Sequence, residues 1–194
     1  MVHRYYRYIV RKPKWTITFL ILTSLIFLLQ PILPLEELWF KPVEAFSKPW
    51  TFVTSMFLHA GFGHLFFNMF ALFIFGIFLE PRISQGNFLL LYFLAGILGN
   101  LAYWLTSPLG EMPAVGASGA IYGILGTVAI LHPTLIVWFF PGFPMPMIVA
   151  AGFWVLISVL GMFTPTNIAH QAHLAGLVVG FYLGFKIRRS GEYW

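Results

Sequence analysis

Two residue types that carry much of protein site chemistry are missing from this 194-residue chain, because it contains neither cysteine nor aspartate. Without cysteine there is no disulfide, no thiol nucleophile and no thiolate metal site. All six acidic residues are glutamates, which excludes a protease centre built on paired membrane aspartates. Any nucleophile–histidine pair must also work without an aspartate as its third member.

Charged side chains are scarce as well, at 9% of the residues, whereas 59% are hydrophobic and the mean hydropathy is +0.85. These values lie outside the usual range of soluble globular domains. At ~20 residues per crossing of a ~30 Å hydrocarbon layer, the chain can hold about six membrane-spanning helices. We therefore expect an all-α, multi-pass membrane protein with a single domain.

Prolines, glycines and charges divide the chain into six apolar stretches. The first is too long for the apolar core of a signal peptide and lacks a small-residue cleavage site, so we expect it to be retained. Residues 34–60 mix aromatics, charges and prolines, which is typical of a loop in the membrane interface. The expected parts are a basic N-terminus (1–14), a membrane domain (15–188) with spans at 15–33, 62–79, 87–106, 117–131, 147–163 and 168–188, and a tail (189–194).

The distribution of basic residues predicts the orientation. Nine of the eleven fall on one side if all six stretches cross the membrane. Cytoplasmic loops carry an excess of lysine and arginine, so both termini are expected in the cytoplasm, and the net charge of +5 reflects orientation rather than nucleic-acid binding. The nine are Arg4, Arg7, Arg11, Lys12, Lys14, Arg82, Lys186, Arg188 and Arg189.

The fourth stretch, residues 117–131, is short for a membrane crossing. At 1.5 Å per residue it spans about 22 Å, which is less than the ~30 Å of hydrocarbon. If it reaches the cytoplasmic face at His132, Ser118 lies roughly 8 Å below the opposite face, and His173 lies about 7 Å below it. Non-helical backbone at that depth needs protein or water around it. We therefore expect a submerged fourth helix with Ser118, His173 and a cavity at one level.

Small residues recur on the fourth and sixth stretches, where they would allow two membrane helices to pack backbone to backbone. A side chain as short as serine could then reach the histidine. These expected packing residues are Gly119, Gly123 and Gly126 on the fourth stretch and Ala172, Gly176 and Gly180 on the sixth.

Four motifs stand out along the chain, namely HAGFGHLFFN at 59–68, FGIFLE at 75–80, GASGAIYG at 116–123 and AHLAGLVVG at 172–180. They resemble motifs of the rhomboid family of intramembrane proteases. The first two resemble the family's second helix, the third is similar to its Gly-x-Ser-Gly nucleophile motif, and the fourth to its histidine followed by Gly-x-x-x-Gly. The motifs follow the family's order over residues 48–184. The resemblance implies a compact six-helix rhomboid bundle of the prokaryotic type, located in a prokaryotic plasma membrane.

The resemblance further implies a serine endopeptidase that hydrolyses bonds in or near transmembrane segments of single-span or other membrane proteins. Ser118 would be the nucleophile and His173 its general base, forming an acyl-enzyme. His64 and Asn68, four residues apart on one helix face, would stabilise the oxyanion with the Ser118 backbone N–H, typically worth about 3 kcal/mol per donor. Tyr122 would pack against or orient the His173 ring. No cofactor, metal or nucleic acid is implied.

Each assignment has a structural alternative. A serine in a membrane helix commonly bonds to a carbonyl, so Ser118 alone fits a packing role equally well. A histidine is costly to bury in a membrane, so a functional role is the first interpretation of an intramembrane histidine such as His173. His64 and Asn68 also fit a polar packing pair. His59 would support the loop or His64, but an ordinary surface role fits it as well.

Further polar residues have structural interpretations. His170 fits a helix start better than a ligand, and His132 fits a helix end, where a cation is favoured. Glu80 is expected to cap or pair at the end of the second span, with Arg82 as a partner. By resemblance, Phe153 and Trp154 would form part of a gate, and the loop 162–169 a cap.

Other functions remain open. A catalytically inactive relative would bind membrane clients, although such relatives usually lack the serine or the histidine. A small transporter is disfavoured because the expected spans carry no charge apart from basic residues at the end of the last one. A metalloprotease is disfavoured because the His-Glu-x-x-His motif is missing.

Overall fold

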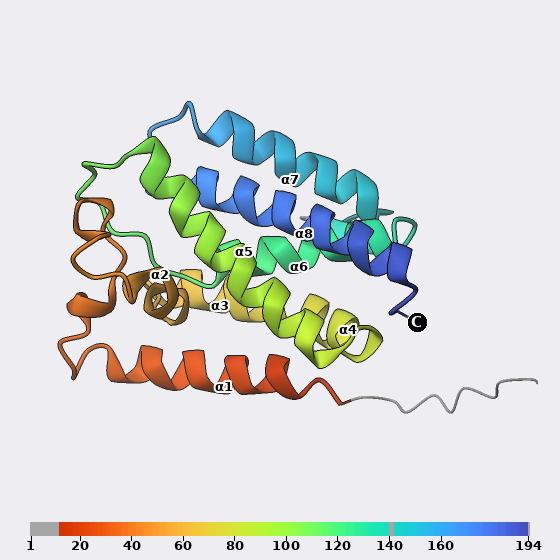
Figure 1. Ribbon diagram of the computed structural model, residues 1–194, viewed down its shortest axis with the longest axis horizontal. Coiled ribbons are helices and arrows are strands. Elements are labelled where there is room, and N and C mark those ends of the chain that lie inside the picture. Colours follow the sequence, from red (N-terminus) through yellow and green to blue (C-terminus); the bar gives the residue numbers. More distant parts are fainter. Residues whose placement is uncertain (1–11, 140–141, 194) are drawn as a thin grey trace, which may run out of the picture.

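A computed structural model describes residues 12–139 and 142–193 of the chain. Most of the expected basic N-terminus (residues 1–11) and Trp194 of the tail therefore lie outside the described residues. The helices are α1 (Lys14–Leu29), α2 (Thr51–Thr54), α3 (Phe62–Ala71), α4 (Ile77–Leu79), α5 (Gln85–Thr106), α6 (Ser118–Leu131), α7 (Met147–Gly161) and α8 (His170–Ser190). Apart from the short α2, the successive helical runs alternate in direction along the long axis, and α1 begins at the end where α8 finishes (Figure 1).

The outer surface of this bundle is strongly apolar. Two helical runs, Phe62–Arg82 and Gln85–Thr106, are long and apolar enough to cross a membrane, and α1, α6 and α7 are apolar but shorter. Large apolar side chains project outward, such as Leu28 at 67% exposure and Phe70 at 53%. So many exposed apolar side chains are a liability in water and suit a lipid environment.

The expected helix boundaries agree closely with the structure for the middle spans and less well for the first and last. The first helix ends at Leu29 rather than Leu33, because Pro31 follows it and the Gln30 side chain is held by another segment. Gln30 Nε2 donates to the His59 carbonyl at 2.9 Å, and the His59 N–H donates back to Gln30 Oε1 at 3.0 Å. The last helix begins at His170 rather than Ile168.

The second expected span is interrupted by a feature that the sequence analysis missed. A π-helical segment, Leu72–Gly76, separates α3 from α4. Gly76 lies directly against α1, since a Cβ there would stand 2.8 Å from both Thr16 Cγ2 and Oγ1. A π-helical turn adds a residue to one turn and thereby changes which faces of the helix meet its neighbours.

Helix α6 occupies the centre of the bundle. Its residues from Gly119 to Leu131 are buried, with Tyr122 half-buried as the exception, which is the pattern of a helix surrounded by others. The expected glycine packing is present: a Cβ on Gly176 or Gly180 would overlap the carbonyl of Gly119 or Gly123, respectively. Thr127 Oγ1 also donates to the Gly180 carbonyl at 3.0 Å, which fixes α8 against α6.

The expectation of an all-α protein is wrong in one place. A two-stranded antiparallel hairpin, β1 (Ile136–Phe139) and β2 (Phe143–Pro146), connects α6 to α7. Ile136 pairs with Pro146 and Trp138 with Pro144. An edge strand of this kind tolerates proline, because the N–H that proline lacks is not needed on the outer side of the strand. The prolines that the sequence analysis took only as helix breakers therefore also lie in a strand.

The expected interfacial loop, residues 34–60, is compactly folded. It contains α2 and three 3-10 turns, at Glu36–Leu38, Pro42–Glu44 and Ser55–Phe57. Lys48 Nζ pairs with Glu37 at 2.7 Å and with Glu44 at 3.0 Å. The hydrogen bond and charge of Lys48 lower the pKa of the Glu37 carboxyl. Glu37 is exposed, whereas Lys48 and Glu44 are half-buried, so we expect these pairs to shape the loop more than they stabilise it.

Glu80 has a different partner from the one expected. Its carboxylate accepts hydrogen bonds from the backbone N–H groups of Trp15 at 2.8 Å and Thr16 at 2.7 Å, so it caps the N-terminus of α1 from the end of α4. Arg82 instead bonds to the Phe78 carbonyl and lies over the Phe78 ring. Helix N-termini leave N–H groups unsatisfied, and a carboxylate is a strong acceptor for them.

We expect Glu80→Gln to lower the free energy of unfolding by about 1–2 kcal/mol, since an amide oxygen replaces a charged acceptor at a buried helix terminus. Thermal unfolding in detergent micelles measures this change. Glu111→Gln, which removes an exposed carboxylate, is the matched control and should leave the midpoint unchanged. Equal midpoints for the two variants would contradict the capping role.

Candidate active site

Three helices begin at one end of the molecule, opposite the described chain ends: α3, α6 and α8 (Figure 1). The first N–H groups of a helix have no partner within it, and its dipole is positive at that end. This end of the bundle therefore favours negative charge, such as the oxyanion of a tetrahedral intermediate.

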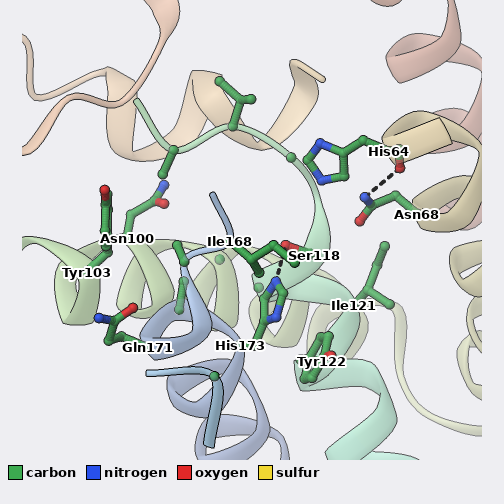
Figure 2. A pocket seen from close by; sticks show the side chains of 18 of the residues that line it. His64, Asn68, Asn100, Tyr103, Ser118, Ile121, Tyr122, Ile168, Gln171 and His173 are labelled. Atoms are coloured by element: carbon green, nitrogen blue, oxygen red, sulfur yellow. Dashed lines mark hydrogen bonds between the residues drawn. The ribbon is translucent and has the colours of Figure 1, made fainter. Parts of the chain in front are cut away.

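Ser118 and His173 meet at this end. His173 Nε2 lies 2.8 Å from Ser118 Oγ, so the two side chains, 55 residues apart in the sequence, share a hydrogen bond (Figure 2). Ser118 is the first residue of α6, and His173 lies in the first turn of α8. The structure thus brings together the two residues that the sequence analysis paired.

The approach of these residues depends on the contact between α6 and α8. Just below the pair, Gly176 packs on the backbone carbonyl of Gly119. Further down, a Cβ on Gly126 would stand 2.7 Å from the Leu177 carbonyl oxygen. Backbone cannot yield as the end of a side chain can, so the glycines set the distance between the helix axes and, with it, the reach of Ser118 to His173.

Tyr122 contacts the other side of the imidazole. Its ring is stacked on the His173 ring, with centroids 4.3 Å apart and an interplanar angle of 13° (Figure 2). The packing of Tyr122 on His173 that the sequence analysis expected is therefore present. Rings in contact over a full face restrict rotation about the side-chain torsions, so the histidine is held in one orientation.

His64 and Asn68 face the same space from α3 (Figure 2). Asn68 Nδ2 donates to the His64 carbonyl at 2.8 Å, which uses one of its two N–H bonds and leaves the other available. The His64 ring lies against Gly116, where a Cβ would be 2.7 Å from His64 Cε1. Gly116 has a φ of 122°, a conformation that favours glycine, so this residue both turns the chain into α6 and makes room for His64.

His59 is more deeply buried than expected, with 1% exposure. Its ring packs edge-on against that of His64, with centroids 4.9 Å apart. Neither ring nitrogen has a hydrogen-bond partner among the described residues, although its backbone is held by Gln30. The surface interpretation of His59 is thus wrong, and contact with His64 is the interpretation that the structure supports.

A cavity of about 860 Å³ opens beside these residues. Its lining includes Ser118, His173, His64, Asn68 and Tyr122. Trp154 of α7 also lines it and packs edge-on against Phe75, with ring centroids 6.2 Å apart. The expected cap segment also contributes to the lining through Met162, Thr164, Thr166, Asn167, Ile168 and Ala169, whereas Phe153 is not among the lining residues.

The sequence analysis missed polar residues of the cavity wall. Asn100 Nδ2 donates to the Phe52 carbonyl at 2.9 Å and to Ser55 Oγ at 3.0 Å, which ties α5 to the loop before α3. Tyr103 donates from its hydroxyl to the Met112 carbonyl at 3.2 Å. A side-chain amide within a long apolar helix is costly unless it forms hydrogen bonds. Asn100 could therefore have been identified from the sequence as a residue with a polar partner.

Two further histidines, His170 and His132, occupy helix ends, as expected. His170 is the first residue of α8, and its ring packs on Gly161, the last residue of α7. His132 follows the last residue of α6. Neither residue lines the cavity.

The arrangement combines a hydroxyl bonded to an imidazole, donors on the adjacent helix and a cavity that reaches them. An imidazole at hydrogen-bond distance can remove the proton of a serine hydroxyl as it attacks a carbonyl. A ring N–H of His64, the free Asn68 N–H and the Ser118 backbone N–H are candidate donors for the resulting oxyanion. Acyl transfer is the chemistry that this set of groups can perform.

Comparisons with known proteins agree with this picture. The Rhomboid domain family matches residues 47–190. The chain is 36% identical over 154 residues to YdcA of Bacillus subtilis, covering 74% of this chain and 69% of YdcA. It is 37% identical over 134 residues to the rhomboid protease GluP of the same bacterium, covering 69% of this chain and 25% of GluP.

A plant relative gives the same result. The chain is 35% identical over 147 residues to the mitochondrial RHOMBOID-like protein 6 of Arabidopsis thaliana, which covers 76% of this chain and 46% of that protein. The chain spans well under two thirds of the length of GluP and of the Arabidopsis protein. The activities and partners of those whole proteins therefore do not pass directly to it.

Proposed function

The chain belongs to the rhomboid family, and from this membership we propose that it is an intramembrane serine endopeptidase with Ser118 and His173 as its catalytic dyad. The observation that carries the proposal is the 2.8 Å contact between Ser118 Oγ and His173 Nε2. Family membership alone does not require activity, but a serine and a histidine that share a hydrogen bond beside a cavity are what nucleophilic catalysis needs.

In the proposed reaction, Ser118 Oγ attacks the scissile carbonyl while His173 Nε2 takes the hydroxyl proton. His173 then returns that proton to the leaving amine, and an acyl-enzyme forms on Ser118. A water from the cavity, activated by His173 in the same way, releases the second product. Tyr122 supports this cycle by holding the imidazole in place, since the chain has no aspartate to do so.

The tetrahedral oxyanion would accept hydrogen bonds from His64, Asn68 and the Ser118 N–H. The start of α6 adds the positive end of a helix dipole to these donors. His59, packed on the His64 ring, would keep His64 directed at the cavity. Each donor of this kind typically lowers the barrier by about 3 kcal/mol.

We further propose that the six helical runs cross the membrane, with residues 15–188 as the membrane domain and both chain ends in the cytoplasm. The alternating direction of the runs supports this topology (Figure 1). The basic residues at the start of α1, after α4 and at the end of α8 also support it, namely Lys12, Lys14, Arg82, Lys186, Arg188 and Arg189. Helix α6 has 14 residues and so measures about 21 Å, short enough to leave its Ser118 end submerged.

The proposed substrates are single-span or other transmembrane proteins. A hydrogen-bonded helix shields its peptide carbonyls, so segments with helix-breaking or small residues near the cleavage site would react most readily. Helix α7 with Trp154, together with the segment 162–169, would admit the substrate. The host membrane is proposed to be a prokaryotic plasma membrane, although mitochondrial relatives make a mitochondrial membrane the alternative.

A fluorophosphonate probe tests the proposal directly. The probe should label the purified protein on Ser118, as found by peptide mass analysis, and labelling should block cleavage of a panel of single-span substrates. Labelling needs an activated serine, so an inactive client-binding relative would remain unlabelled while still co-purifying with membrane proteins. A properly folded protein that neither reacts with the probe nor cleaves any substrate would exclude the enzyme.

A further inference from the structure

The end of α8 that lies away from the candidate active site presents a stripe of aromatic and basic side chains. Tyr182, Phe185, Lys186 and Arg189 line one shallow groove of about 520 Å³. Residues three and four apart lie on the same helix face, so these four side chains form one column. All four are exposed, with Tyr182 at 65% and Phe185 at 53%.

The column changes in character along the helix. Val178, at 57% exposure, lies one turn before Tyr182 and continues the stripe toward the apolar middle of the bundle. The order is therefore aliphatic, aromatic and then cationic over residues 178–189, a length of about 17 Å. A phospholipid has the same order, from acyl chain through the interfacial region to phosphate, over a comparable distance.

The two cations of this stripe have no acidic partner among the described residues. The described ion pairs involve Lys48 instead. Glu192, the nearest acid in sequence, accepts a hydrogen bond from Asn87 Nδ2 at 3.0 Å, and the Glu80 carboxylate caps α1. Their neighbour Arg188 donates to the Ile130 carbonyl at 3.3 Å, so it serves α6 rather than the groove.

We propose that this groove binds one anionic phospholipid, with its phosphate between Lys186 and Arg189 and an acyl chain along Phe185, Tyr182 and Val178. Lysines and arginines that only determine the orientation of a protein in the membrane need no aromatic neighbours on the same helix face. Here Tyr182 and Phe185 precede the cations by one turn, as a lipid site requires. The phosphate supplies the negative charge that the protein does not place there.

The proposal is tested by native mass spectrometry of the full chain with phosphatidylglycerol or with phosphatidylcholine of the same acyl chains. We expect one phosphatidylglycerol to be retained about 10- to 30-fold more strongly than phosphatidylcholine, since each cation near an anionic lipid contributes modestly. The double variant K186Q/R189Q should lose this preference. The double variant K12Q/K14Q removes the same charge from the same end of the bundle and should keep it.

Two further pairs of measurements distinguish binding of a phospholipid from general attraction between charges and from binding of free phosphate. The exchange K186R/R189K conserves charge and should retain the lipid, whereas Y182S/F185S conserves the cations and should weaken retention. Inorganic phosphate should not compete at millimolar concentration, because the acyl chain contributes to binding. Loss of the preference in K12Q/K14Q to the same extent as in K186Q/R189Q, or full displacement by inorganic phosphate, would overturn the site. Thermal unfolding of every variant reports whether it is folded, independently of lipid and of catalytic activity.

Discussion

Substitution of Ser118 by alanine should reduce substrate cleavage by at least ~10³-fold and leave the fold intact. The change removes one oxygen atom, whose described hydrogen bond is with His173 Nε2. Without that oxygen the imidazole has no nucleophile to activate, while the helix packing around it is unaffected. Cleavage of a single-span substrate in detergent or liposomes, followed by product mass, measures the effect.

Two comparisons make this result specific. Ser47→Ala removes a hydroxyl from the exposed loop before α2 and should retain full activity. His173→Ala should match Ser118→Ala, because groups that act as a unit give non-additive losses, and the double variant should be no worse than either alone. Full activity in Ser118→Ala would exclude the dyad. An equally large loss of activity in Ser47→Ala would indicate that the effect of Ser118→Ala comes from impaired folding.

Substitution of Gly180 by alanine should destabilise the protein by about 1–3 kcal/mol and also abolish fluorophosphonate labelling. The added methyl group would overlap the carbonyl of Gly123, which is backbone and cannot rotate away. Helix α8 must therefore move from α6, and His173 moves with it. Thermal unfolding and probe labelling measure the two consequences separately.

The control for this change is Gly152→Ala on α7. A Cβ at Gly152 meets nothing within 4 Å. Alanine favours a helix over glycine by roughly 1 kcal/mol, so this variant should be as stable as the parent or slightly more stable. The two glycine-to-alanine changes thus have opposite expected signs, and a stabilised, fully reactive Gly180→Ala protein would contradict the role of the close helix contact.

The sequence predicted the site better than it predicted the connections between helices. Ser118 and His173 could be paired because small residues at four-residue spacing mark a close helix contact, and the depth of a residue follows from its position in a helix. Both arguments depend on periodicity, which a sequence displays. The expected boundaries of 117–131 and 62–79 lie close to α6 and to the α3–α4 run for the same reason.

Features that depend on tertiary contact were not predicted. The π-helical turn at Leu72–Gly76 lies where Gly76 meets Thr16 of another helix, and no local signal reports that contact. Glu80 was expected to interact near its own helix, but its partners are the N–H groups of Trp15 and Thr16, more than sixty residues earlier. The hairpin was missed because its prolines were read as ends of helices.

The glycine contact between α6 and α8 also suggests a way to control the protein from a distance. Ser118 and His173 are each attached near the start of a helix, so a change in the distance or angle between α6 and α8 moves the two side chains relative to each other. A small apolar compound that inserted between the helices near Gly126 and Leu177 would therefore separate Ser118 from His173 without entering the cavity. Inhibitors of this type would compete with helix packing rather than with substrate, and raising the substrate concentration would not relieve them.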